Sequence, residues 1–322
     1  MGWVDAARGI GIVLVVVGHA LAGLRGAGLL PEAEPWLFLH RFVYAFHMPL
    51  FFFLAGLFVL GPARASTARF LDSKLRTVAW PYLVWSVLQT LVQAGTGGTN
   101  QAVGLAALPA ILHRPIMQFW FLYALFLMLV LFALLVRAGA GPAAVLAVAA
   151  ALYVVPSVGS LGPWGPAYSV ASFMVYLAAG VSLGRVVHGW LAVVPQRLAG
   201  GLAAFGFGLV AAGTAAGLDG ARATAPLLAA CGIAASALLA KTLAGSAVLG
   251  EWGRLSLPIF VAHTLASAGV RMALARGLHL GWWPLHVAAG IAAGLLLPVR
   301  LARLVERAGV PGVFTWPARR RG

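Results

Sequence analysis

Four ionisable side chains stand inside long apolar stretches of the sequence, where such groups are rare. His19 follows Arg8 by eleven residues, and His47 and His263 lie in two later apolar stretches. An ionisable group inside a bilayer costs on the order of 3 kcal/mol on insertion scales, so it marks a functional site by default. Histidine can act as a general base or a nucleophile near neutral pH, and the forked guanidinium of arginine suits phosphate groups.

The three histidines are expected at a similar depth on three helices. His19 lies about 16 Å beyond Arg8 along a helix and on the same face, because eleven residues are close to three turns. His47 is near the middle of the second apolar stretch, just before Pro49, which is expected to kink that helix. A single intramembrane histidine can be explained by a packing hydrogen bond. Three at matched depth indicate a shared polar cavity.

Other charged residues near these stretches have a simpler interpretation as well as a functional one. Asp5 can form an ion pair with Arg8, three residues on, at the interface. Arg41 stands near the outer end of the second stretch, from which its long side chain can reach the interface. A basic loop then follows, and its charges either bind phosphate or only set the topology; it contains Arg64, Arg69, Lys74 and Arg76.

Membrane-spanning helices must position these residues. Of the 322 residues, 62% are apolar and 9% are charged, whereas a soluble domain carries about 25% charged residues. We therefore predict an all-α polytopic membrane protein of about ten transmembrane helices. The apolar segments are 5–24, 37–60, 77–94, 117–136, 141–156, 169–187, 198–217, 223–243, 255–275 and 282–304.

The basic residues predict the orientation of these helices. The net charge of +15 would suggest nucleic acid as the partner of a soluble protein, but here it indicates topology, since cytoplasmic loops are rich in Lys and Arg. With both termini cytoplasmic, the outer loops hold only Arg25, Arg114, Arg222 and Arg276. The inner loops and the C-terminal end hold Arg64, Arg69, Lys74, Arg76, Arg137, Arg185, Arg197, Lys241, Arg254, Arg300, Arg303, Arg307, Arg319, Arg320 and Arg321.

Five motifs resemble the membrane acyltransferase-3 family, and they occur in the order that the family has. The first is the Arg–ten residues–His signature that ends at His19. The others are Phe46-His47-Met48-Pro49, Lys74-Leu-Arg76 leading to Trp80-Pro81-Tyr82, Phe119-Trp120-Phe-Leu-Tyr123, and Ser256-Leu-Pro-Ile-Phe-Val-Ala-His263. The second motif is similar to the fucose-4-O-acetylase-like branch. In place of the family's Arg-x-x-Arg motif, Lys74 and Arg76 are two residues apart, and the preceding arginine is Arg69.

The resemblance implies an enzyme of the inner or plasma membrane that moves an acyl group, commonly acetyl, from cytoplasmic acyl-CoA to a hydroxyl group. The acceptor would be a carbohydrate or another cell-envelope molecule. His19 would be the catalytic histidine with Arg8 as its partner, and Lys74, Arg76 and Arg69 would bind the donor. Residues 1–307 would form one transmembrane acyltransferase domain, followed by a short basic cytoplasmic tail, 308–322. The acyl-CoA would be a substrate, and no permanently bound cofactor is expected.

Several alternatives stay open from the sequence. His19 would act either as a general base or as a carrier of the acyl group. His47, His263 and Arg41 would orient the acceptor or relay a proton, and Trp120 would stack on a sugar ring or anchor its helix at the interface. A transporter of protons or of a lipid-linked sugar would also need intramembrane His and Arg, and a non-catalytic scaffold would not need His19. No HExxH motif or cysteine cluster predicts a metal site.

Overall fold

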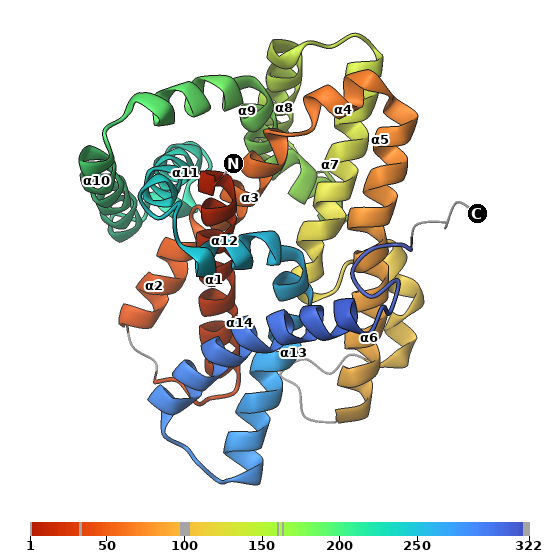
Figure 1. Cartoon of the computed structure of the whole chain (residues 1–322), viewed down its shortest axis with the longest axis vertical. Coiled ribbons are helices and arrows are strands. Elements are labelled where there is room, and N and C mark those ends of the chain that lie inside the picture. The colour runs from red at the N-terminus through yellow and green to blue at the C-terminus, as the bar shows by residue number, and fades with distance from the viewer. Residues whose placement is uncertain (1, 32–33, 97–103, 160, 163, 318–322) are drawn as a thin grey trace. The chain divides into compact units, whose positions relative to one another are not determined.

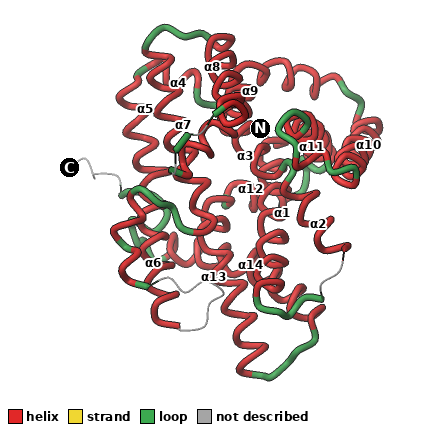
Figure 2. Tube along the Cα trace, turned by 180° about the vertical axis from the view of Figure 1, so that it is seen from behind, coloured by secondary structure: helices red, strands yellow, loops and turns green. Residues whose placement is uncertain are grey.

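The computed structural model describes residues 2–31, 34–96, 104–159, 161–162 and 164–317, and these residues form helices and loops but no β-strand (Figures 1 and 2). Within this part of the chain, eight helical segments are long and apolar enough to cross a membrane. They are Gly2–Gly26, Pro35–Gly56, Leu105–Arg137, Gly165–Val193, Gln196–Ala215, Ala225–Thr242, Ser256–Gly277 and Trp283–Arg307. The chain is therefore an all-α, multi-pass membrane protein.

Two of the ten segments expected from the sequence form shorter helices. Segments 77–94 and 141–156 correspond to α6 (Trp80–Thr96) and α8 (Pro142–Val158), which have 17 residues each. A helix of this length rises about 25 Å, which is less than the roughly 30 Å of a bilayer's hydrocarbon core.

The chain divides into two compact units that interleave in sequence. Unit 1 comprises residues 1–51 and 188–306, and unit 2 comprises residues 52–187 and 307–322. The single domain expected over residues 1–307 stays a prediction.

In unit 1, helix α1 (Gly2–Gly26) packs against α11 (Ala225–Thr242), α12 (Ala247–Arg254) and α13 (Ser256–Met272) (Figure 1). The backbones of α1 and α12 meet directly, because a Cβ atom on Gly253 would overlap the carbonyl oxygen of Asp5. The same unit contains α2 (Glu34–Tyr44), α10 (Gln196–Ala215) and most of α14 (Trp283–Arg307). Helix α1 is thus held on several sides along its length.

The second apolar segment is broken in two, into α2 and α3 (His47–Gly56). The break falls at Ala45 and Phe46, four and three residues before Pro49. Because proline has no amide hydrogen and its ring crowds the carbonyl four residues earlier, Pro49 prevents a helical bond to Ala45. The bond from the Leu50 amide to the Phe46 carbonyl, at 2.9 Å, is the first after the break.

Unit 2 contains α4 (Leu60–Ala65), α5 (Thr67–Lys74), α6, α7 (Trp120–Arg137), α8 and most of α9 (Gly165–Val193). The expectation of a basic loop between the second and third segments is wrong, because this stretch is helical. The Ser66 hydroxyl accepts the Arg69 amide and caps α5. Helix α5 then runs into α6 through a π-helical turn, Leu75–Ala79.

The expected tail is folded where the structure describes it. Its residues 308–317 pack on α6, where the indole nitrogens of Trp80 and Trp85 donate to the carbonyls of Gly312 and Val313 at 2.7 and 2.8 Å. The Trp316 ring packs edge-on against Trp80. Arg319, Arg320 and Arg321, which made the tail basic, lie outside the described residues.

Candidate functional site

The structure brings His19 of α1 and His263 of α13 into direct contact. His19 Nδ1 lies 2.7 Å from His263 Nε2, which is hydrogen-bond distance. The two rings are stacked, with centroids 5.0 Å apart and planes 13° from parallel. His263 is fully buried and His19 is partly buried.

The other ring nitrogen of His263 faces the backbone of its own helix. His263 Nδ1 lies 2.7 Å from the Phe260 carbonyl oxygen and 3.1 Å from that of Ile259. A carbonyl oxygen can only accept a hydrogen bond, so Nδ1 is the nitrogen that carries the proton. This contact also fixes the direction in which the ring points.

His47 stands at the start of α3, next to the break in the second segment. Its Nδ1 donates to the Val43 carbonyl at 2.8 Å, and its side chain is buried. The Tyr44 ring lies near both this histidine and the pair described above, with its centroid 4.7 Å from that of His47 and 6.4 Å from that of His19. His40 stacks on the Tyr44 ring, with centroids 3.9 Å apart.

Sequence reasoning missed Tyr44, although the sequence holds a signal for it. His40, Tyr44 and His47 are spaced four and three residues apart, which places them along one side of a helix. An aromatic residue between two histidines at this spacing indicates a shared surface.

Arg8 does not approach these rings. Its Nη1 lies 3.9 Å from Asp5 Oδ1, so the pair expected from the spacing is formed on α1. About 16 Å of helix rise separates Arg8 from His19. Arg8 therefore lies near the N-terminal end of α1, where its partly exposed side chain is accessible.

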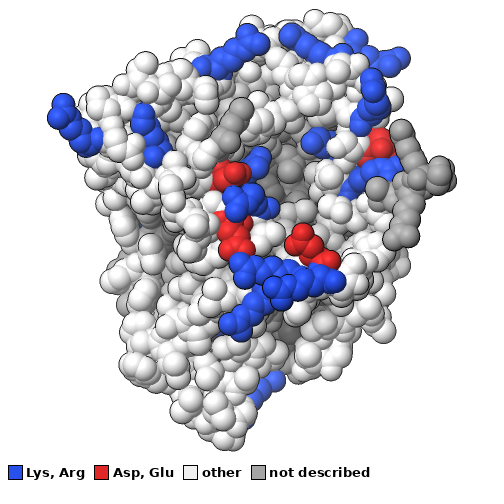
Figure 3. Space-filling view, viewed as in Figure 1, with Lys and Arg blue, Asp and Glu red and all other residues white. Residues whose placement is uncertain are grey.

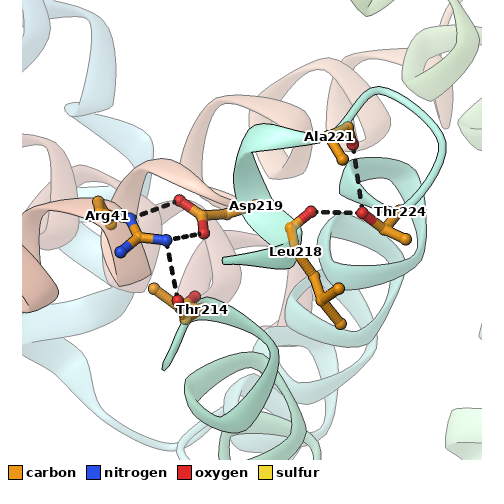
Figure 4. A network of polar contacts seen from close by, with 6 residues as sticks. All are labelled: Arg41, Thr214, Leu218, Asp219, Ala221 and Thr224. Carbon is orange, nitrogen blue, oxygen red and sulfur yellow. Dashed lines mark hydrogen bonds and ion pairs between the residues drawn. The ribbon is translucent and has the colours of Figure 1, made fainter. Parts of the chain in front are cut away.

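Arg41 is held in a polar network at the turn between α10 and α11 (Figure 4). Its guanidinium binds both carboxylate oxygens of Asp219 and donates to the Thr214 carbonyl at 2.9 Å. The hydrogen bond from Arg41 holds the pKa of Asp219 below its usual value. The network fastens α2, which carries Tyr44, to the α10–α11 turn.

The residues expected to bind the donor all belong to α5 and the π-turn of unit 2. Arg76 Nε and Nη2 donate to Asp72 at 2.8 and 3.1 Å, and these bonds lower the pKa of Asp72. The Lys74 ammonium lies 5.2 Å from the centroid of the Phe70 ring. Arg69 is exposed at the start of the helix. The three cations are accessible, and part of the charge of Arg76 is already balanced.

Trp120 also lies in unit 2, at the first residue of α7, where its ring packs 5.3 Å from that of Phe173. Packing between the two aromatic rings is sufficient to account for Trp120 at this position.

Acidic side chains on the face shown in Figure 3 lie against basic ones. Two ion pairs of unit 1 join Asp5 to Arg8 and Glu251 of α12 to Arg303 of α14. Among the described residues, no group of three or more His, Cys, Asp or Glu side chains is placed to hold a metal ion.

Comparison with known proteins gives one match. Residues 1–303 match the family model Acyl_transf_3, described as an acyltransferase domain. Neither the curated proteins nor the solved structures gave a match.

Proposed function

The chain belongs to the Acyl_transf_3 family and is a membrane acyltransferase, and we propose that it moves an acyl group from acyl-CoA to a hydroxyl group. Acetyl is the acyl group, the cell's inner or plasma membrane is the location, and a carbohydrate or another envelope molecule is the acceptor. The likeness of residues 46–49 to the fucose-4-O-acetylase-like branch supports a sugar hydroxyl as acceptor.

The observation that carries the proposal is the contact between His19 and His263. A histidine in the middle of a membrane helix is costly, and here a second histidine orients it at 2.7 Å. Such an oriented imidazole is the usual arrangement of a general base or nucleophile. The family match supplies the reaction for which such a group is needed.

Two routes use His19. As a general base it takes the proton of the acceptor hydroxyl, the oxygen attacks the thioester carbonyl, and the thiolate leaves with that proton. As a nucleophile its unprotonated ring nitrogen attacks the same carbonyl and CoA leaves as the thiolate. The acceptor hydroxyl then takes the acyl group from the acyl-imidazolium, and the hydroxyl proton passes to the thiolate. Both routes return the ring to its starting state.

The cations would bind the phosphates of the donor. Arg8 is accessible at one end of α1, and Lys74, Arg76 and Arg69 are accessible on α5. Arginine and lysine both bind phosphate, arginine through its fork and lysine as a point charge. His47, Arg41 and Trp120 are proposed to orient the acceptor. For Arg41 this role is indirect, since its guanidinium is occupied by Asp219.

The test is release of free thiol from acetyl-CoA by the purified full chain in nanodiscs, compared with His19→Ala. Turnover that is lost in this variant supports the proposal. His113→Ala is the matched control, because the His113 side chain is exposed on a loop of unit 2. Turnover that survives in His19→Ala contradicts the role of His19. If neither turnover nor acetyl-CoA binding is found, the donor assignment is wrong and a transport role gains support.

A further inference from the structure

The contacts of His263 determine which of its nitrogens holds a proton. Nδ1 faces the carbonyl oxygens of Ile259 and Phe260 and must donate to them. A neutral imidazole carries one proton, so Nε2 of the same ring is left with a lone pair and acts as an acceptor. The tautomer of His263 is thus fixed by the backbone of α13.

The lone pair on His263 Nε2 in turn determines the tautomer of His19. Its Nδ1 lies 2.7 Å from that lone pair, so the proton between the two nitrogens belongs to His19 Nδ1. In neutral His19 the remaining nitrogen, Nε2, has no proton. We propose that His263 is a positioning residue that holds His19 in the Nδ1–H tautomer and leaves Nε2 as the reacting atom. This inference rests on the proposed function for what Nε2 does.

A proton relay through His263 conflicts with this geometry. To pass a proton on, His263 would accept it at Nε2 and release the one at Nδ1, but Nδ1 faces only amide carbonyl oxygens in the contacts that fix it. These oxygens are hydrogen-bond acceptors and not bases that carry a proton away. The chain of hydrogen bonds therefore ends at the α13 backbone. The proton taken up by His19 Nε2 stays on His19 until the leaving thiolate removes it, while Nδ1–H keeps its bond to His263.

The remaining titratable groups near His19 come from α2 and the start of α3. They are His40, Tyr44 and His47, and the centroid of the Tyr44 ring lies 6.4 Å from that of His19. His47 has the same arrangement as His263, with Nδ1 donating to the Val43 carbonyl. The hydrogen bond to a nitrogen of His19 comes from His263, so the tautomer of His19 depends on His263.

Two variants of His263 separate positioning from relay. Glutamine can accept the His19 Nδ1 proton through its amide oxygen but cannot be protonated, whereas leucine can do neither. We expect His263→Gln to keep most of the thiol-release rate and His263→Leu to lose a large part of it, because only the His19 fraction with unprotonated Nε2 can react; the upper bound is the contribution of a general base, about 10²–10⁴-fold. Equal loss in two variants that elute as folded protein would indicate a relay and overturn the inference. Wild-type rates in both would remove any role for His263.

A second measurement does not depend on activity. In the full chain with ¹⁵N-labelled histidine rings, the His19 signals are identified by their loss in His19→Ala. We expect Nδ1 protonated and Nε2 unprotonated in the wild type and in His263→Gln, and a mixture of tautomers in His263→Leu. A wild-type His19 protonated at Nε2 overturns the inference, even if the enzyme is active. The expected tautomer without thiol release would instead contradict the proposed function alone.

Discussion

Gly294 of α14 touches both helices that carry the histidine pair. A Cβ atom at this position would lie 2.6 Å from Ser267 Oγ, 2.7 Å from Val16 Cγ1 and 3.6 Å from His263 Cβ. Val16 is three residues before His19 on α1, and Ser267 is four residues after His263 on α13. The substitution Gly294→Ala would therefore act on the two helices from the point at which α14 packs against them.

The size of the disturbance follows from these distances. Ordinary van der Waals contact begins at 3.4 Å, so Val16 and Ser267 would each have to move by roughly 0.7 to 0.8 Å. Val16 is fully buried and its branched side chain is stiff, so helix movement has to absorb the strain. Overpacking of this kind costs about 1–3 kcal/mol. The same movement would stretch the 2.7 Å bond between the histidines toward the limit of about 3.2 Å.

The assay compares Gly294→Ala with Gly290→Ala, one turn earlier on α14. At Gly290 the nearest atom to an added Cβ is Ala20 Cβ at 3.9 Å, an ordinary contact, and alanine favours the helix by about 0.5–1 kcal/mol. Thermal unfolding in detergent should therefore show Gly294→Ala less stable and Gly290→Ala as stable as wild type or more so. Thiol release should fall only in Gly294→Ala. Equal stability and equal rates in the two variants would refute the packing argument.

Three further predictions concern contacts away from the histidines. Asp219→Asn should lower the free energy of unfolding by up to about 1 kcal/mol. Because Arg41 depresses the pKa of Asp219, this difference should be constant above a pH of about 4 and vanish as pH falls through the lowered pKa. Unfolding curves at several pH values would show this dependence. Lys241→Met should lower the free energy of unfolding by about 1–2 kcal/mol, because the Lys241 ammonium donates to two carbonyls at the end of α9. Lys241→Arg should keep much of this stability in the same unfolding assay. Equal stability of the two variants would contradict the prediction. Trp316→Ala removes the ring packed on α6 and should speed proteolysis after α14, and an unchanged cleavage rate would argue against that packing.

The sequence predicts the helices of this protein better than their ends. Hydropathy locates every long span, and Pro49 correctly indicates a break in the second one. The break occurs at Ala45 and Phe46, because proline disrupts the bond to the residue four positions earlier. The charged stretch around Arg69 and Lys74 forms a helix, although a polar stretch between two apolar segments is typical of a loop.

For the site, the sequence predicts depth but not contact. The spacing of Arg8 and His19 predicts how far apart they lie along their helix. The position of His47 just before a proline predicts its depth in the second segment in the same way. The pairing of His19 with His263 joins residues 244 positions apart and depends on how α1 packs on α13, which periodicity alone does not determine. The proton positions on the two rings depend in turn on backbone carbonyls and so become visible only in three dimensions. The catalytic roles of these residues stay predictions.

The π-turn Leu75–Ala79 sets the rotational phase between α5 and α6. Its bond from the Trp80 amide to the Leu75 carbonyl spans one residue more than an α-helical bond, just before Pro81, which has no amide hydrogen to give. Each residue turns a helix by roughly 100°. If the same residues formed an unbroken α-helix, buried Phe70 would turn by roughly 100° about the helix axis relative to buried Tyr82. A one-residue insertion thus lets a helix with an exposed basic surface and a helix with a buried polar stripe form one continuous rod.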